Sequence, residues 1–198
     1  MHPDLPAGGY AAWARGAAAA IRGERDAEVP CGDCTACCTS AQFIHVAPDE
    51  LDTLAHLPAE LLVPAPGLPE GHRVMGYDEQ GRCPMFRDGG CTVYEHRPRT
   101  CRTYDCRVFP ATGVAVADEL PAVAARAARW RFAVADDEDR RHLTAVHAAV
   151  ESLREQVATR GGPGPSPTQL AARAVEVHET FLEPPRRRRG PAGAQAPT

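Results

Sequence analysis

The chain lacks lysine and asparagine altogether and contains only two isoleucines among its 198 residues. All 22 of its basic residues are therefore arginines, while alanine, glycine and proline are abundant, as expected from a GC-rich coding sequence. Because this bias places arginine and alanine throughout the chain, neither residue type by itself is strong evidence of function.

Large apolar side chains are also scarce. Leucine, isoleucine, valine and phenylalanine together account for 34 residues, or 17 % of the chain, although 43 % of all residues are apolar because 35 are alanines. A fraction this low is typical of disordered proteins when the net charge is high, but the formal net charge here is only −4. We therefore expect a folded chain with a thin hydrophobic core that needs stabilisation from another source.

Targeting segments are not evident. No stretch approaches the roughly 20 apolar residues of a membrane-spanning helix, so we expect no membrane partner. Asp4 and Gly8-Gly9 stand where a secretory signal has positive charge followed by an apolar run. We expect a cytoplasmic protein, and in a reducing compartment its eight cysteines are better suited to metal binding or redox chemistry than to structural disulfides.

Local signals predict short elements before and between the cysteines. The alanine-rich segment Tyr10–Arg25 is predicted to be a helix, and Gln42–Val46 a short strand. Proline followed by two acidic residues predicts a helix over Pro48–Leu57. Residues 58–72, rich in proline, are predicted to be a loop, and Arg73–Tyr77 a second strand.

Two helices are predicted in the C-terminal part. Asp136–Arg160 carries apolar residues at alternating spacings of three and four, which is typical of an amphipathic helix. After a Gly/Pro-rich break, Ser166 and Gln169 form a capping-box signal with Pro167 at the first helical position, and the same spacing continues to Phe181. We expect an antiparallel helical pair packed on the cysteine region.

The composition divides the chain into four segments. No alanine occurs between Pro66 and Pro110, in contrast to the rest of the chain. This indicates that each position of that stretch requires a specific side chain. The predicted fold class is α+β, with a small cysteine-rich metal-binding core of short strands packed against helices. The segments are an N-terminal helical segment (1–27), a cysteine-cluster metal-binding domain (28–110), a helical region (111–183) and a disordered basic tail (184–198).

The tail contains the basic run Arg186–Arg189, which carries +4, so the rest of the chain carries −8. A nucleic-acid-binding arm is conceivable for such a run. Because the body is acidic and has no aromatic–basic surface motif, a solvated tail is favoured and nucleic acid is not expected as a partner.

The cysteines fall into two sets of four within 76 residues. They are Cys31-x2-Cys34-x2-Cys37-Cys38 and Cys83-x7-Cys91-x9-Cys101-x4-Cys106. A Cys-x2-Cys turn lets two sulfurs converge on one ion while loop amides donate hydrogen bonds to the thiolates. Three ligands spaced by two, completed by a remote fourth, also suit an iron–sulfur cluster. We predict that the thiols bind zinc or iron, including the possibility of an iron–sulfur cluster, and that the two sets meet in space.

The neighbouring Cys37 and Cys38 pose a geometric problem, because adjacent side chains usually diverge. Two neighbouring four-thiolate centres would use all eight cysteines; the alternative is one centre plus a redox pair. Six arginines between Arg82 and Arg107 could offset the −2 charge of a four-thiolate centre. The competing interpretation, that these are ordinary surface arginines, has equal weight.

Residues 28–110 closely resemble the CxxCxxCC family of zinc- or iron-chelating cysteine-cluster proteins. The resemblance rests on all eight cysteines and on the run Tyr94-Glu-His-Arg97-Pro98-Arg-Thr-Cys101-Arg102. It implies that Cys31, Cys34, Cys37, Cys38, Cys83, Cys91, Cys101 and Cys106 are the metal ligands. It also implies that Tyr94, Arg97, Pro98 and Arg102 support the metal centre. Asp105 is a departure, because the family often has proline before the last cysteine.

The function expected from this resemblance is metal chelation with a structural or redox-active centre, so that the metal ion is the expected partner besides an unidentified protein. The alternative is an enzyme or an accessory subunit of one, since flagellin lysine N-methylases share the cysteine pattern. Those enzymes are much larger, and this chain has no glycine-rich turn after a strand to hold a methyl donor. A non-enzymatic protein is therefore favoured, and enzymatic activity stays open.

Histidines are weaker candidates for ligands. His45 and His96 lie near the cysteine sets and could supply a nitrogen, but with eight thiols available a surface or supporting role is favoured. The remaining histidines considered have no ligand spacing. They are His56, His72, His142, His147 and His178.

Overall fold

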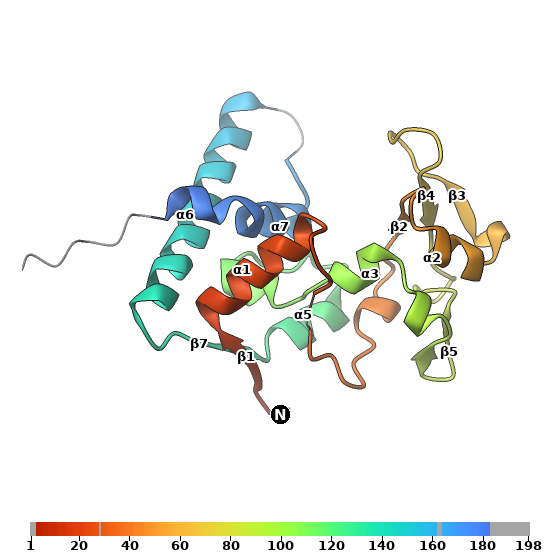
Figure 1. Cartoon of the computed structure of the whole chain (residues 1–198), viewed down its shortest axis with the longest axis horizontal. Coiled ribbons are helices and arrows are strands. Elements are labelled where there is room, and N and C mark those ends of the chain that lie inside the picture. The colour runs from red at the N-terminus through yellow and green to blue at the C-terminus, as the bar shows by residue number, and fades with distance from the viewer. Residues whose placement is uncertain (1–2, 28, 162–163, 183–198) are drawn as a thin grey trace, which may run out of the picture.

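The computed structural model describes residues 3–27, 29–161 and 164–182. Figure 1 shows a helical lobe at one side and a smaller lobe with short strands at the other. Two separate clusters of buried apolar side chains form the cores of the two lobes. The α+β class is confirmed.

The helical lobe combines the beginning of the chain with its second half. Its helices are α1 (Tyr10–Ile21), α4 (Val108–Thr112), α5 (Pro121–Ala127), α6 (Asp137–Arg160) and α7 (Pro167–Val177), followed by a 3-10 turn over His178–Phe181. The predicted packing of the two C-terminal helices on each other is confirmed, since α6 and α7 are in contact, and both also contact α1. In Figure 1, α7 runs across α6.

The predicted start of α7 is also confirmed. The Ser166 side chain accepts from the Gln169 amide, and the Gln169 side chain accepts from the Ser166 amide, which completes the capping box with Pro167 at the first helical position. At α6, the Asp136 side chain accepts from the Asp139 amide. Side-chain caps of this kind satisfy backbone donors that the helix leaves free at its N-terminus.

Small side chains make up much of the core of the helical lobe. Ala14, Ala18 and Ala149 are fully buried, so the helices can approach closely where large side chains are scarce. Three aromatic rings fill the remaining space, with centroids 4.8–5.8 Å apart. They belong to Tyr10, Trp13 and Phe132.

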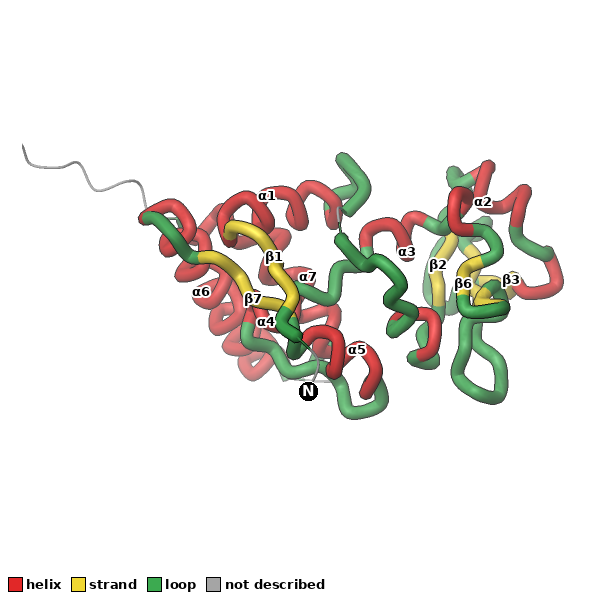
Figure 2. The backbone as a smooth tube through the Cα atoms, turned by 90° about the horizontal axis from the view of Figure 1, so that it is seen from below, coloured by secondary structure: helices red, strands yellow, loops and turns green. Residues whose placement is uncertain are grey.

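A parallel strand pair at the edge of this lobe was not expected. Strand β1 (Leu5–Gly9) precedes α1 and pairs with β7 (Trp130–Ala133), as Figure 2 shows. Its register shifts between Pro6 and Gly8, where Gly8 adopts a φ of 90° that suits glycine. The pairing joins two segments far apart in the sequence.

The strand lobe contains a three-stranded antiparallel sheet in the order β2 (Ile44–Val46), β4 (Arg73–Met75), β3 (Leu62–Pro64). Strands β2 and β4 and helix α2 (Leu51–His56) agree with the predicted elements. The loop predicted over residues 58–72 was wrong at β3, which lies at the edge of the sheet, where a proline is tolerated.

The rest of the strand lobe consists of very short elements. They are the hairpin β5 (Phe86–Arg87) and β6 (Gly90–Cys91), the 3-10 turns Cys37–Thr39 and Tyr94–His96, and α3 (Arg99–Thr103). The core beneath them is small, and three cysteines pack against its side. These are Cys83, Cys91 and Cys101. The cysteines of the second set are therefore part of the wall of the lobe.

Within the described residues, no helix combines the length and the apolar character needed to cross a membrane. The predicted disordered tail at 184–198 lies outside the described residues. The proposed boundaries of the other three segments stay predictions, although α1 and the helices after residue 108 share one core.

Candidate metal centre

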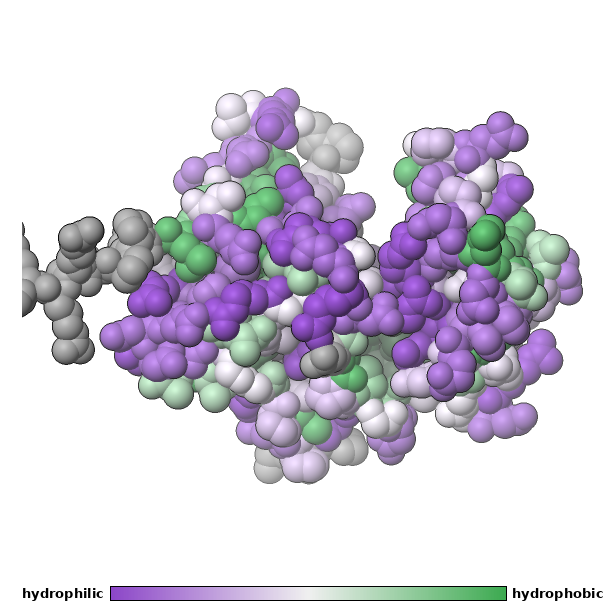
Figure 3. Space-filling view, in the orientation of Figure 1, coloured by the Kyte–Doolittle hydropathy of each residue, from purple (hydrophilic) through white to green (hydrophobic). Residues whose placement is uncertain are grey.

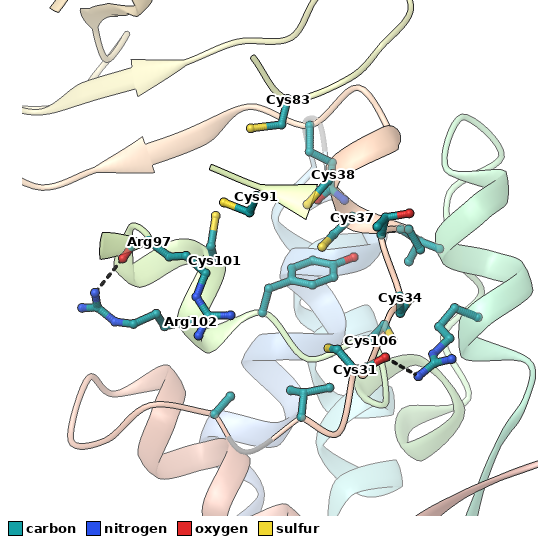
Figure 4. A pocket seen from close by; sticks show the side chains of 18 of the residues that line it. Cys31, Cys34, Cys37, Cys38, Cys83, Cys91, Arg97, Cys101, Arg102 and Cys106 are labelled. Carbon is teal, nitrogen blue, oxygen red and sulfur yellow. Dashed lines mark hydrogen bonds between the residues drawn. The ribbon is translucent and has the colours of Figure 1, made fainter. Parts of the chain in front are cut away.

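One cavity of about 870 Å³ lies between the two lobes, and cysteines from both sequence sets line it. Figure 3 shows a notch between the two lobes on the face drawn, and Figure 4 shows the side chains of the cysteines. All are free thiols: Cys31, Cys34, Cys37, Cys38, Cys83, Cys91, Cys101 and Cys106. The backbone also connects the sets, since the Cys83 amide donates to the Cys38 carbonyl over 2.8 Å. The two sets meet, as the spacing predicted.

Four of the thiols gather beside the strand lobe: Cys38, Cys83, Cys91 and Cys101. Burial raises the pKa of Cys101 to about 12, and the charges of Cys37, Cys83 and Cys91 act in the same direction. The pKa of Cys38 is raised mainly because its thiol donates to Cys37, and then by burial and by the nearby Cys83 and Cys101. Cys38, from the first sequence set, therefore belongs with three thiols of the second. We call these four the strand-lobe thiols.

Three thiols gather beside the helical lobe: Cys31, Cys34 and Cys106. Burial raises the pKa of Cys106 to about 11, and Asp105, Cys31 and Cys34 also raise it. The indole Nε1 of Trp130 donates to the Cys106 sulfur over 3.2 Å, which favours the thiolate. Cys106, from the second set, thus lies with the first two cysteines of the first. We call these three the helical-lobe thiols.

Cys37 lies between the two groups and differs from its neighbour. Its pKa is lowered to about 7, first because the Cys38 thiol donates to it and also through backbone amides and the charge of Arg97. Cys37 in turn raises the pKa values of Cys31 and Cys101, one thiol from each group. The sequence predicts that the adjacent side chains of Cys37 and Cys38 diverge, and in the structure the two thiols have different surroundings.

Arg97 is a basic residue whose charge acts on Cys37 and Cys101, as the charge of Arg126 acts on Cys31. The guanidinium of Arg97 lies 3.8 Å from the Tyr94 ring centroid, and its Nε is buried without a hydrogen-bond partner. Its charge lowers the pKa values of both Cys37 and Cys101. A desolvated cation in this position would stabilise a negatively charged thiolate centre.

Two other arginines position the loops around the thiols. Arg102 donates to the Arg97 carbonyl over 2.6 Å and to the Asp26 carboxylate over 3.1 Å, so it joins the Arg97 loop to the segment before Cys31. Arg126, on α5, donates to the Cys31 carbonyl over 3.1 Å. Figure 4 shows both main-chain hydrogen bonds as dashed lines.

The comparison with known families agrees with this chemistry. Residues 30–119 match the model of the CxxCxxCC family, which is described as "Putative zinc- or iron-chelating domain". This segment, 90 of the chain's 198 residues, is similar to a CxxCxxCC domain. No curated protein and no solved structure matches the chain. The matched residues include all eight cysteines, so the resemblance seen in the sequence is confirmed.

Asp105, where the sequence departs from the usual pattern of the CxxCxxCC domain, has a structural role. Its carboxylate accepts from the Trp13 indole over 2.8 Å and forms a largely buried ion pair with Arg107 at 2.8 Å. The turn before Cys106 is thereby anchored to α1. Sequence reasoning missed Trp13 and Trp130 at this site, although they are the only two tryptophans of the chain.

Histidines do not join the thiols, because none of the described ones lines the cavity between the two lobes. Instead, six of them form three pairs that the sequence did not reveal. The pairs are His45 with His72, His56 with His96, and His142 with His178. The expectation that His45 and His96 lie outside the ligand set agrees with this arrangement.

The donor set of the cavity fits zinc or iron. Thiolates are soft ligands that select zinc and iron–sulfur clusters over hard cations. Three buried polar groups of residues that line the cavity, Gln42 Nε2, Arg97 Nε and the Tyr104 hydroxyl, have no hydrogen-bond partner of suitable geometry. Burial raises the pKa of Tyr104, and the neighbouring Gln42 acts in the opposite direction. As donors they suit an anionic metal–thiolate centre.

Proposed function

We propose that the protein binds zinc or iron in two adjacent thiolate centres, each built from both sequence sets. The strand-lobe thiols form one centre. Cys37 completes the helical-lobe thiols, Cys31, Cys34 and Cys106, to form the other. The observation that carries the proposal is the grouping of Cys38 with Cys83 and Cys101, and of Cys106 with Cys31 and Cys34.

Electrostatics explains why a cation belongs here. Burial keeps Cys101 and Cys106 protonated at neutral pH, since it raises their pKa values to about 12 and about 11. A bound cation reverses this, because a coordinating thiol is deprotonated outright. Metal binding then releases protons, and the affinity increases with pH.

The proposed centres also join the two lobes. Cys101 lies on α3 and packs against the strand-lobe core, whereas Cys106 precedes α4 and packs against the helical core. A structural role follows, in which metal binding contributes directly to folding. An iron–sulfur cluster at the same place would add redox chemistry.

Anaerobic purification followed by elemental analysis and visible spectroscopy tests this proposal. Zinc centres would give a colourless protein with about two zinc ions per chain, four thiolates to each ion. Iron centres would give a coloured protein, with acid-labile sulfide if clusters are present. A protein that holds neither metal and whose eight thiols all react freely would contradict the proposal.

An enzyme or an accessory subunit of one is a second candidate, favoured by the size of the cavity. Its volume of about 870 Å³ lies within the range of small-molecule sites, about 300–1,000 Å³. The test is isothermal titration of the metal-loaded protein with the methyl donor S-adenosylmethionine. Saturable binding would support this candidate, and no binding would contradict a methyl-transfer role.

A further inference from the structure

A second group of metal-ligating side chains lies outside the cysteine cavity, where α2 meets the 3-10 turn Tyr94–His96. Asp52 and His56 occupy positions i and i+4 of α2, so one face of the helix presents both. His96 comes from the turn. One ligand atom from each of the three residues lies within 4.8 Å of the other two, a spacing that no three thiols reach in the described part of the chain.

The spacing within this group is close to the separation of two ligands on one ion. The His96 Nδ1 lies 2.9 Å from one Asp52 carboxylate oxygen, and the His56 Nδ1 lies 3.6 Å from the other. Two ligands about 2.0–2.2 Å from a tetrahedral zinc ion are about 3.4 Å apart, between these two separations. An imidazole nitrogen binds a metal in the plane of its ring, so at least one of the parallel rings of His56 and His96 must rotate out of the stack before the three ligands meet on one ion.

The two imidazoles are held in parallel. Their ring centroids are 3.4 Å apart and their planes differ by 3°, so the rings of His56 and His96 stack face to face. The His56 Nδ1 is also 2.8 Å from the Asp52 carbonyl oxygen, and ion binding would replace that hydrogen bond. The side chains are 69 %, 43 % and 38 % exposed for Asp52, His56 and His96, which leaves a path for an ion and for coordinating water.

We propose that Asp52, His56 and His96 form a second metal site, distinct from the cysteine centres, for a divalent transition cation such as Zn²⁺. Two imidazoles and one carboxylate are ligands that zinc accepts, and water completes the coordination of a partly exposed ion. The other stacked histidine pair, His45 with His72, has no comparable carboxylate in a three-ligand group.

Occupation of this site would fasten α2 to the segment that carries Arg97. His96 precedes Arg97 directly, and the Thr53 hydroxyl of α2 donates to the Arg97 carbonyl over 3.4 Å. The surface ion would thus restrain the loop from which Arg97 reaches the thiols, without sharing a ligand with the cysteine centres.

The test is a Zn²⁺ titration of the full chain, followed by NMR of the histidine ring protons and by isothermal calorimetry after the thiols have been saturated with metal. We expect one further zinc equivalent that shifts the His56 and His96 resonances. His56→Gln and His96→Gln should each weaken this binding at least tenfold. His72→Gln, the matched control from the other stacked pair, should bind as the parent protein does.

Elemental analysis of all variants separates this site from the cysteine centres, since the thiol-bound metal should be unchanged by His96→Gln. The NMR readout applies even if the thiols hold no metal, so failure of the proposed function would not obscure the result. The proposal would be overturned if added zinc shifted neither histidine ring signal. It would also be overturned if zinc bound to His96→Gln as tightly as to the parent protein.

Discussion

The two lobes of this protein differ in what holds them together. The helical core contains buried tryptophan, tyrosine and phenylalanine among closely packed alanines and valines contributed by several helices. The strand-lobe core consists of six buried apolar side chains, with Cys83, Cys91 and Cys101 packed at its edge. Its strands are only two or three residues long, too short for independent stability. Apolar burial can support the first lobe, whereas we expect the second to need metal bound to its thiols.

The largest expected effect is the response to metal removal. Chelation under reducing conditions should unfold the segment Cys31–Cys106 and leave α6 and α7 helical, because the small core cannot replace the lost metal–thiolate bonds. Hydrogen exchange read for α6 and for β4 measures the two lobes separately. Equal protection of β4 before and after complete chelation would contradict the difference between the lobes.

The second effect concerns the adjacent cysteines. Cys38→Ser should abolish the strand-lobe centre, because a hard hydroxyl substitutes poorly for a soft thiolate. Cys37→Ser should either remove the other, separable metal equivalent or leave the metal content intact and change only thiol reactivity. Metal analysis of the two variants prepared side by side measures this. If both lose the same equivalent to the same degree, Cys37 and Cys38 serve one centre.

Truncation of a core side chain in the helical lobe should destabilise that lobe without changing the metal content. Val146 is fully buried on α6, and Val146→Ala should lower the free energy of unfolding of the helical lobe by about 2 kcal/mol. Val63 on β3 is 52 % exposed, so Val63→Ala is a control expected to change little. Urea unfolding and metal content measure the two consequences. A loss of bound metal in Val146→Ala would show that the lobes are not separable.

Loss of the buried cation should weaken the metal centre more moderately. Arg97→Gln should reduce metal affinity at least tenfold, about 1.4 kcal/mol, since it removes the charge that faces Cys37 and Cys101. Arg99→Gln is the matched control, because the Arg99 side chain pairs with Asp49 at the surface. Competition with a chelator of known affinity compares the variants. Equal affinities of Arg97→Gln and the parent protein would show that Arg97 does not support the metal centre.

The smallest effect is a pH dependence confined to the helical lobe. The His142 Nδ1 lies 2.9 Å from the His178 Nε2, and burial lowers the pKa of both histidines. Arg15 adds to both shifts, Glu179 opposes both, and Glu138 opposes that of His142. Because the folded-state values lie below the unfolded value of about 6.5, stability is fully present above that pH and declines as the pH falls below it.

Urea unfolding of the metal-free protein from about pH 7.5 to about pH 5.5, monitored by its helical signal, measures this decline across the histidine range. His178→Gln should flatten the dependence, and His147→Gln should leave it unchanged, as His147 belongs to none of the three pairs. An identical slope in His178→Gln and in the parent would exclude the buried pair as its origin.

Local signals in the sequence were sufficient to predict those helices and strands whose ends depend on residues close together in the chain. The start of α7 depends on Ser166, Pro167 and Gln169, which lie within four residues of one another. The β1–β7 pair was missed because it joins residues 5–9 with residues 130–133 and contains glycines that carry no strand signal. The short edge strand β3 was missed for a related reason, since its pairing partner determines it more than its own residues do.

The candidate site, too, has some features that the sequence predicted and others that depend on tertiary structure. Cysteine spacing identified all eight thiols, and the neighbouring pair at 37 and 38 already suggested two surroundings. The association of Cys106 with Cys31 and Cys34 arises from tertiary structure, since 72 residues separate Cys34 from Cys106. The three histidine pairs depend on tertiary structure in the same way, and no local spacing indicated them.

Each proposed centre draws cysteines from both sequence sets, and the metal content of paired variants distinguishes this grouping from a grouping by sequence. Cys31→Ser, Cys106→Ser and their double variant should all lose the same single centre, whereas the double variant of Cys106→Ser with Cys101→Ser should lose both. Elemental analysis after anaerobic purification gives the count. If Cys101→Ser and Cys106→Ser lose one and the same centre while Cys31→Ser loses another, the cysteines are grouped by sequence, and the two mixed centres do not exist.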